Sequence, residues 1–90
     1  MKLLSVDRSL EIFDKKSNEL VAEYPIKLEL EILSGIVKKI KNDELLYRQY
    51  NLSKRQTKIL LTYLNLDLMI EMKSYRYFLA CSGNYNWNDK

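Results

Sequence analysis

Residues 9–26, SLEIFDKKSNELVAEYPI, carry the pattern on which the rest of the fold depends. Apolar and polar side chains alternate at its start, so Leu10 and Ile12 share one face of a strand. The polar run 14–18 is typical of a turn, because Asp and Asn side chains hydrogen-bond to nearby backbone. Alternation then resumes, and the whole stretch predicts a β-hairpin. The second strand is expected to place on one face Leu20, Ala22, Tyr24 and Ile26.

Two helices are predicted after this hairpin. Residues 28–41 repeat apolar side chains at spacings of three and four, which predicts one buried stripe of Ile32, Leu33, Ile36, Val37 and Ile40. Gly35 disfavours a helix by ~1 kcal/mol relative to Ala, so we expect that it packs closely on the sheet. Ser53 and Gln56 have the spacing of a capping box and start a second helix, which is expected to run to about Asn65. Its predicted buried stripe is Ile59, Leu60, Tyr63 and Leu64.

Alternating side chains predict a final strand over residues 75–82, and a weaker extended segment over residues 68–72. The predicted class is therefore α+β, with the order β-β-α-α-β. We expect a three-stranded antiparallel sheet, with the last strand beside the first and both helices packed on one face. The other face is left for solvent or a partner, and it carries either Tyr75 and Tyr77 or Arg76 and Phe78. Residues 1–82 are expected to form a single domain and residues 83–90 an irregular tail.

Composition argues against most catalytic chemistry. The 90 residues include no histidine, one cysteine and two glycines. Acid–base catalysis near neutral pH relies on histidine, and zinc sites need several Cys or His ligands. We therefore expect a protein with no catalytic residue, no metal and no cofactor. Cys81 is interpreted as a small buried apolar residue rather than a reactive thiol.

Positive charge concentrates in the middle of the chain. Residues 36–58 hold seven basic against two acidic side chains, while the chain as a whole has a net charge of +3. This basic block, taken as residues 38–58, has three interpretations: an acidic surface on a partner protein, a nucleic acid, or a solvated face without further role. No apolar run is long enough for a signal peptide or a membrane span, so a cytoplasmic protein without membrane contact is expected. A monomer or a weak homodimer paired through sheet edges is expected as well.

Aromatic and arginine side chains are the usual anchors of protein interfaces. On this basis the candidate partner-binding residues are Tyr47, Arg48, Tyr50, Arg76, Tyr85 and Trp87. Trp87 has an alternative role, in which it folds back over the open face of the sheet and completes the core.

The hairpin also carries a resemblance. Residues 11–15 read EIFDK and residues 19–25 read ELVAEYP, which is similar to the VFDK…ELVxEYP pattern of small bacterial proteins encoded beside polymorphic or contact-dependent toxins. The later order of Tyr47, Tyr50, Gln56 and the YRYFL run 75–79 is similar too, whereas Arg76 stands where that pattern prefers an acid. The resemblance implies an immunity protein that binds and blocks a cognate toxin. Because the middle of this chain is basic, we expect such a toxin to present an acidic surface at the contact. The resemblance implies no catalytic residues.

Overall fold

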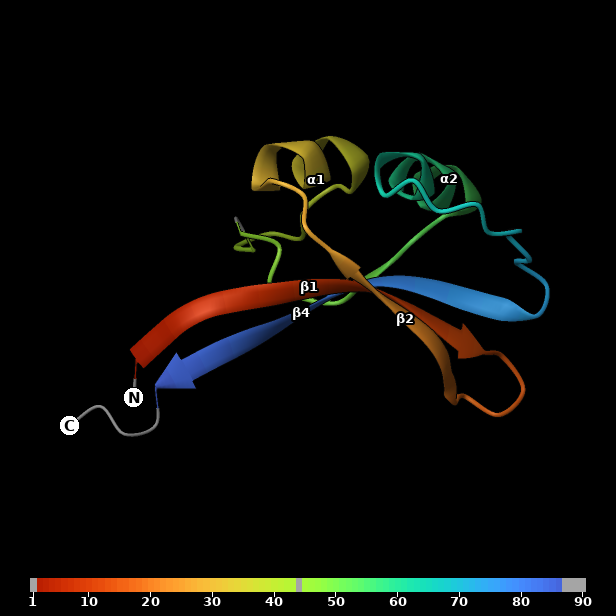
Figure 1. The fold of residues 1–90 in the computed structure, drawn as a ribbon, viewed down its shortest axis with the longest axis horizontal. Helices are drawn as coiled ribbons and strands as arrows, with labels where there is room; N and C mark the ends of the chain where they lie inside the picture. Colours follow the sequence, from red (N-terminus) through yellow and green to blue (C-terminus); the bar gives the residue numbers. More distant parts are fainter. Residues whose placement is uncertain (1, 44, 87–90) are drawn as a thin grey trace.

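The computed structural model describes residues 2–43 and 45–86, and among these the side chains of residues 6–43 and 45–83. Four antiparallel strands form one sheet in the order β2-β1-β4-β3, and two helices lie over one of its faces (Figure 1). The elements in chain order are β1 (Lys2–Asp14), β2 (Leu20–Ile26), α1 (Leu30–Ile36), β3 (Tyr50–Asn51), α2 (Lys54–Tyr63) and β4 (Tyr75–Asn86). The α+β class and the helices on one face are confirmed. The expected three strands and the order β-β-α-α-β are wrong, because the short strand β3 intervenes between the helices.

The predicted hairpin forms, and its turn is closed by Asp14. The Asp14 carbonyl accepts a 2.8 Å hydrogen bond from the Asn18 amide, and its carboxylate accepts one of 2.7 Å from the Lys16 amide. Leu10 and Ile12 are buried as expected, opposite Tyr24 and Ala22. The register shifts between Ile12 and Phe13, so the first residue of β2, Leu20, is exposed rather than aligned with the buried face.

Helix α1 is shorter than predicted, because the residues after Ile36 make tertiary contacts that are incompatible with a continued helix. The backbone of Val37 is already extended, and the Ile40 amide donates a 3.0 Å hydrogen bond to the Tyr50 hydroxyl. Ile40 consequently leaves the buried stripe and is exposed. The expected close packing at Gly35 is wrong, since a Cβ there would meet nothing within 4 Å.

Helix α2 begins as predicted. The Ser53 hydroxyl accepts from the Gln56 amide at 3.1 Å, and the Gln56 side chain accepts from the Ser53 amide at 2.8 Å. The buried stripe is rotated from the predicted one: Thr57, Leu60 and Leu61 are buried, whereas the predicted Ile59 and Tyr63 are exposed. Thr57 can be buried because its hydroxyl donates to the Ser53 carbonyl at 2.8 Å.

The last strand is longer than expected, and the segment before it is not a strand. β4 continues to Asn86, so residues 83–86 are not an irregular tail, while residues 87–90 lie outside the described part. It pairs with β1 along its whole length, which places the last strand beside the first as predicted. Residues 66–71 belong to neither a helix nor a strand, and a turn at residues 72–74 accounts for the change of alternation.

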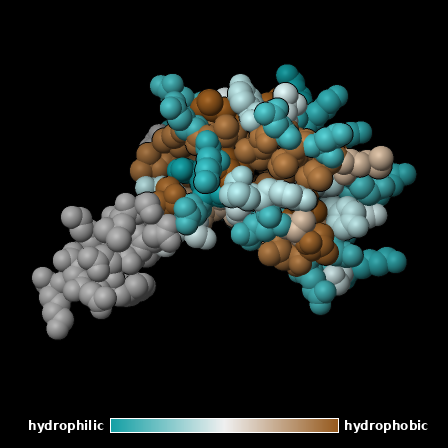
Figure 2. All heavy atoms as spheres, in the orientation of Figure 1, coloured by the Kyte–Doolittle hydropathy of each residue, from teal (hydrophilic) through white to brown (hydrophobic). Residues whose placement is uncertain are grey.

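The core lies between the sheet and the helices. Its members come from every layer, with Leu10 and Leu79 from the sheet, Leu33 and Leu60 from the helices, and Leu46 from the connector between α1 and β3. Hydrophobic side chains also reach the surface over the helix layer and at the β1–β2 end of the sheet (Figure 2). Within the described residues, no helix has the length and apolar character required to cross a membrane.

Candidate functional site

No helix or strand of the described residues covers the face of the sheet turned away from the helices, which we call the uncovered face (Figure 1). Alternation along the strands assigns side chains to it, because Ile12, Tyr77 and Leu79 are buried on the helix side. Their neighbours in the chain, Phe13 and Phe78, therefore point to the uncovered face. Of the two pairs considered for this face, the structure selects Arg76 and Phe78.

A shallow hollow of about 200 Å³ lies on this face. We call it the aromatic hollow, and its lining consists of Phe13, Asn18, Gln49, Arg76 and Phe78. The rings of Phe13 and Phe78 meet edge to face, with centroids 5.5 Å apart and planes at 84°. This geometry suits the positive edge of one ring and the negative face of the other. The two rings therefore form an apolar floor from two neighbouring strands.

Polar groups surround this floor. The Arg76 guanidinium donates one hydrogen bond of 3.4 Å to Oδ1 of Asn18, and Gln49 Nε2 donates one of 3.1 Å to Oε1 of Glu11. A guanidinium has five N–H donors, so Arg76 retains capacity to bind a carboxylate. Glu11 and Glu23 also belong to this face by alternation, which gives the rim both signs of charge.

The connector between α1 and β3 is organised around the buried carboxylate of Asp43. Its Oδ1 accepts from the Tyr47 amide at 2.9 Å, and its Oδ2 accepts from the Arg48 amide at 3.1 Å and from the Tyr50 hydroxyl at 2.5 Å. Leu46 is fully buried with φ of 54°, a left-handed conformation that non-glycine residues rarely adopt. Packing of Leu46 and the bonds to Asp43 together hold the connector in one shape, which brings Gln49 to the aromatic hollow.

These contacts shift the pKa values of both groups in the connector. The hydrogen bond from Tyr50 lowers the pKa of Asp43 below its ordinary value, with help from the Arg48 and Tyr47 amides and against the effect of burial. Burial raises the pKa of Tyr50, and its hydrogen bond to the Asp43 carboxylate raises it further. The carboxylate is therefore held ionised and the phenol protonated, which is the state that their hydrogen bond requires.

The structure separates the predicted partner-binding residues. Tyr47 and Arg48 are exposed on the connector, and Arg76 lies in the aromatic hollow. Tyr50 has only 7% of its surface exposed and its hydroxyl is engaged, so it supports the connector and is unavailable to a partner. The Tyr85 backbone pairs with Leu3, and Trp87 lies outside the described residues.

The sequence-based candidates did not include Phe13 and Gln49, and Phe78 was named only in one of the two alternative pairs for the open face. A signal for the two phenylalanines was present, since Phe13 follows the apolar Ile12 in a strand and Phe78 stands between Tyr77 and Leu79, so each points to the opposite face from those neighbours. No comparable signal existed for Gln49, because it depends on the fold of the connector.

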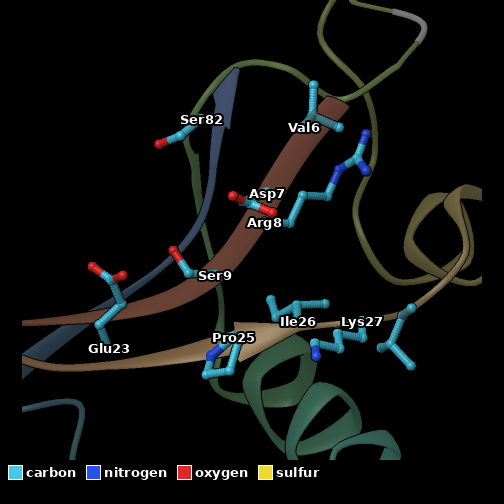
Figure 3. A pocket seen from close by; sticks show the side chains of 10 residues that line it. Val6, Asp7, Arg8, Ser9, Glu23, Pro25, Ile26, Lys27 and Ser82 are labelled. Carbon is cyan, nitrogen blue, oxygen red and sulfur yellow. The ribbon is translucent and has the colours of Figure 1, made fainter. Parts of the chain in front are cut away.

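A larger hollow of about 550 Å³ lies where β2 ends and β1 continues (Figure 3). Arg8 extends to one side, where its Nη2 donates to the Leu45 carbonyl at 2.6 Å. Ser9, Glu23 and Ser82 point to the other side (Figure 3). The charged and hydroxyl groups of this hollow therefore diverge instead of meeting at one point.

The remaining reactive groups are dispersed. Cys81 is half-buried rather than fully buried as expected, and burial raises the pKa of its thiol, which favours the unreactive protonated form. In residues 2–43 and 45–86, no group of three or more His, Cys, Asp or Glu side chains could hold a metal ion.

Fold and site together define a small α+β protein whose four-stranded sheet is covered by helices on one face only. The chain belongs to a family described as a domain of unknown function (DUF7683), whose model matches residues 7–80. That match begins inside β1, spans β2, both helices and β3, and ends halfway along β4. No curated protein and no solved structure matches the chain.

Proposed function

We propose that this protein is a non-catalytic binding module that holds a partner protein on its uncovered sheet face. The observation that carries the proposal is the Phe13–Phe78 pair, which lies on that face beside the guanidinium of Arg76. Aromatic and arginine side chains supply most of the binding energy at protein interfaces, commonly above about 1 kcal/mol each when truncated. The aromatic hollow would take an apolar side chain of the partner, and Arg76 would bind a carboxylate next to it.

The mixed charge of the rim refines the expected partner. An acidic contact surface is suited to Arg76 and to Arg48, which is exposed on the connector, whereas Glu11 and Glu23 favour basic groups. We therefore expect acidic groups of the partner opposite the arginines and basic groups opposite the glutamates. Such matched charges would mainly accelerate association and exclude wrong partners.

The specific partner that we propose is a toxin domain, which makes this protein an immunity protein. Support comes from the similarity of the hairpin to proteins encoded beside such toxins. The mechanism would be steric: the bound sheet face would occlude the active surface of the toxin without any reaction. The rigid connector would contribute Tyr47 and Arg48 at the periphery.

Co-expression tests this proposal. The C-terminal domain encoded immediately upstream would be expressed alone and together with this protein, followed by copurification. We expect rescue of growth and a complex that Arg76→Glu weakens at least about tenfold, equivalent to about 1.4 kcal/mol. Arg55→Glu makes the same charge change on α2 and should leave the complex unchanged. Rescue that is equally strong with Arg76→Glu and with Phe78→Ala would refute the sheet face as the contact.

Nucleic-acid binding is the second candidate, and one observation favours it. Every basic side chain of the block is exposed, namely Lys38, Lys39, Lys41, Arg48, Lys54, Arg55 and Lys58. The Gln56 amide group donates to the Ile36 carbonyl at 3.2 Å, which brings the end of α1 to the start of α2 and so joins the two basic runs. Affinity for RNA or DNA should then fall steeply with salt, because phosphate contacts release counterions. A gel shift that is absent at low salt would remove this candidate.

A further inference from the structure

A groove of about 290 Å³ runs between α2 and the residues that follow it. One face of α2 forms one wall, with Lys54, Lys58, Leu61 and Thr62 at successive helical turns. Alternate residues of the following segment form the other wall, with Leu66, Leu68 and Ile70. We call this the α2 groove, and it shares no lining residue with the aromatic hollow.

The middle of the backbone along one wall of the α2 groove has no hydrogen-bond partner among the residues that the structure describes. Asp67–Ile70 make no hydrogen bond with any residue that the structure describes. The segment is anchored only at its ends, where the Leu66 amide donates to the Leu61 carbonyl at 3.0 Å and the Glu71 amide donates to the Tyr77 hydroxyl at 3.0 Å. Burial alternates along it, and Met69 is 93% exposed. The alternating burial and the absence of internal hydrogen bonds leave the backbone of this segment available to a partner strand.

The chemistry of the lining identifies the kind of partner. Leu61, Leu66, Leu68 and Ile70 provide an apolar floor, and both charged lining residues, Lys54 and Lys58, are basic. Since they are four residues apart on a helix, their ammonium groups stand along the same side of the groove. A ligand that fits must combine apolar side chains with carboxylates, and it must offer backbone groups to the unpaired segment.

We infer that the α2 groove binds an extended acidic peptide segment of a partner protein, which adds as a strand beside Asp67–Ile70. Main-chain hydrogen bonds would give affinity, as in other cases of strand addition. Apolar side chains of the peptide would enter the groove at alternate positions, and its carboxylates would pair with Lys54 and Lys58. The volume accommodates one or two side chains and lies at the lower limit for small-molecule pockets, which also favours a peptide.

Fluorescence anisotropy with a defined probe tests this inference. The probe is a labelled peptide that alternates glutamate and leucine, and its reference is the same peptide with lysine in place of glutamate. We expect a Kd of about 100 µM or tighter for the acidic peptide, and binding at least about tenfold weaker for the basic one. Equal binding of the two peptides, or none by the acidic one at about 1 mM, would overturn the inference.

Two further comparisons locate the site. The double variant Lys54→Glu, Lys58→Glu should bind the acidic peptide at least about tenfold more weakly than the wild type. The double variant Lys38→Glu, Lys41→Glu makes the same charge change outside the groove and should bind the peptide as tightly as the wild type. The same peptide with N-methylated backbone amides should also bind at least about tenfold more weakly, and this comparison leaves the protein unaltered. If the N-methylated peptide binds as tightly, strand addition is excluded. If a single-stranded oligonucleotide displaces the peptide at equal concentration, the site is a phosphate surface instead.

Discussion

The hydroxyl of Tyr50 donates a 2.5 Å hydrogen bond to Oδ2 of Asp43, and both side chains are buried. Tyr50 is also the first residue of β3, where it lies opposite Leu79 of β4. The bond therefore ties the connector after α1 to the sheet at the place where β3 begins. Through the same carboxylate, the connector holds Tyr47 and Arg48 at the surface and leads Gln49 to the aromatic hollow.

Replacement of Tyr50 by Phe should destabilise the protein. The ring still fills its place in the core, but the Asp43 carboxylate and the Ile40 amide lose their shared partner. We expect the free energy of unfolding to fall by about 1–2 kcal/mol in urea denaturation, the usual effect of leaving buried polar groups unsatisfied. Tyr47→Phe removes the same hydroxyl from an exposed ring, so a loss of equal size in that variant would contradict the assigned role.

Stability should decline in acid partly through Asp43. Because its pKa is lower in the folded protein than in the unfolded chain, its stabilising contribution is complete above the unfolded pKa of about 3.9. That contribution is lost as the pH falls through the lower folded value, where the carboxylate accepts a proton. Unfolding measured between about pH 5 and pH 2 should show a smaller pH dependence in Asp43→Asn than in the wild type. Parallel curves for the two proteins would disprove this assignment.

Loss of the α2 cap should have a moderate effect. Ser53→Ala removes the acceptor of the Gln56 amide, and we expect thermal and urea unfolding to show a loss of about 1 kcal/mol. Ser34→Ala, an exposed position inside α1, is the matched control and should change stability by less than about 0.5 kcal/mol. A Ser53→Ala protein as stable as this control would show that the cap contributes nothing.

Gly35→Ala should stabilise the protein. The glycine lies in α1 with ordinary negative φ, and an added Cβ has free space around it. Alanine would restrict the unfolded chain and favour the helix, so we expect a gain of about 0.5–1 kcal/mol in the free energy of unfolding. A loss of stability would contradict the free space around Gly35, because it would mean that the added Cβ is strained within the folded chain.

The hairpin and the start of α2 could be predicted because their determinants are local. Alternation with a period of two identifies the buried face of a strand, and the turn at Asp14 is closed by its own side chain and backbone. Likewise, Ser53 and Gln56 satisfy each other within a single helical turn. Arg76 was chosen as a candidate by residue type, and the structure places it on the uncovered face.

Features that depend on distant residues could not be predicted. Helix α1 stops at Ile36 although its apolar pattern continues to Ile40, because a hydrogen bond to Tyr50 requires the Ile40 amide. The buried face of α2 is set by its position over the sheet, and it exchanges the predicted Ile59 and Tyr63 for Thr57 and Leu61. Propensity is worth only tenths of a kcal/mol per residue, so packing and buried hydrogen bonds override it.

Sequence alone determined the hairpin, the buried face of its first strand, the cap of α2 and the α+β class, since these follow from patterns among residues close together in the chain. The tertiary structure decided the formation of the additional strand β3, the burial of Tyr50 and the contact of Phe13 with Phe78 across β1 and β4. It also decided that Asp67–Ile70 lie unpaired beside α2. These features require residues far apart in the chain to come together, and that convergence depends on the free energy of the whole core.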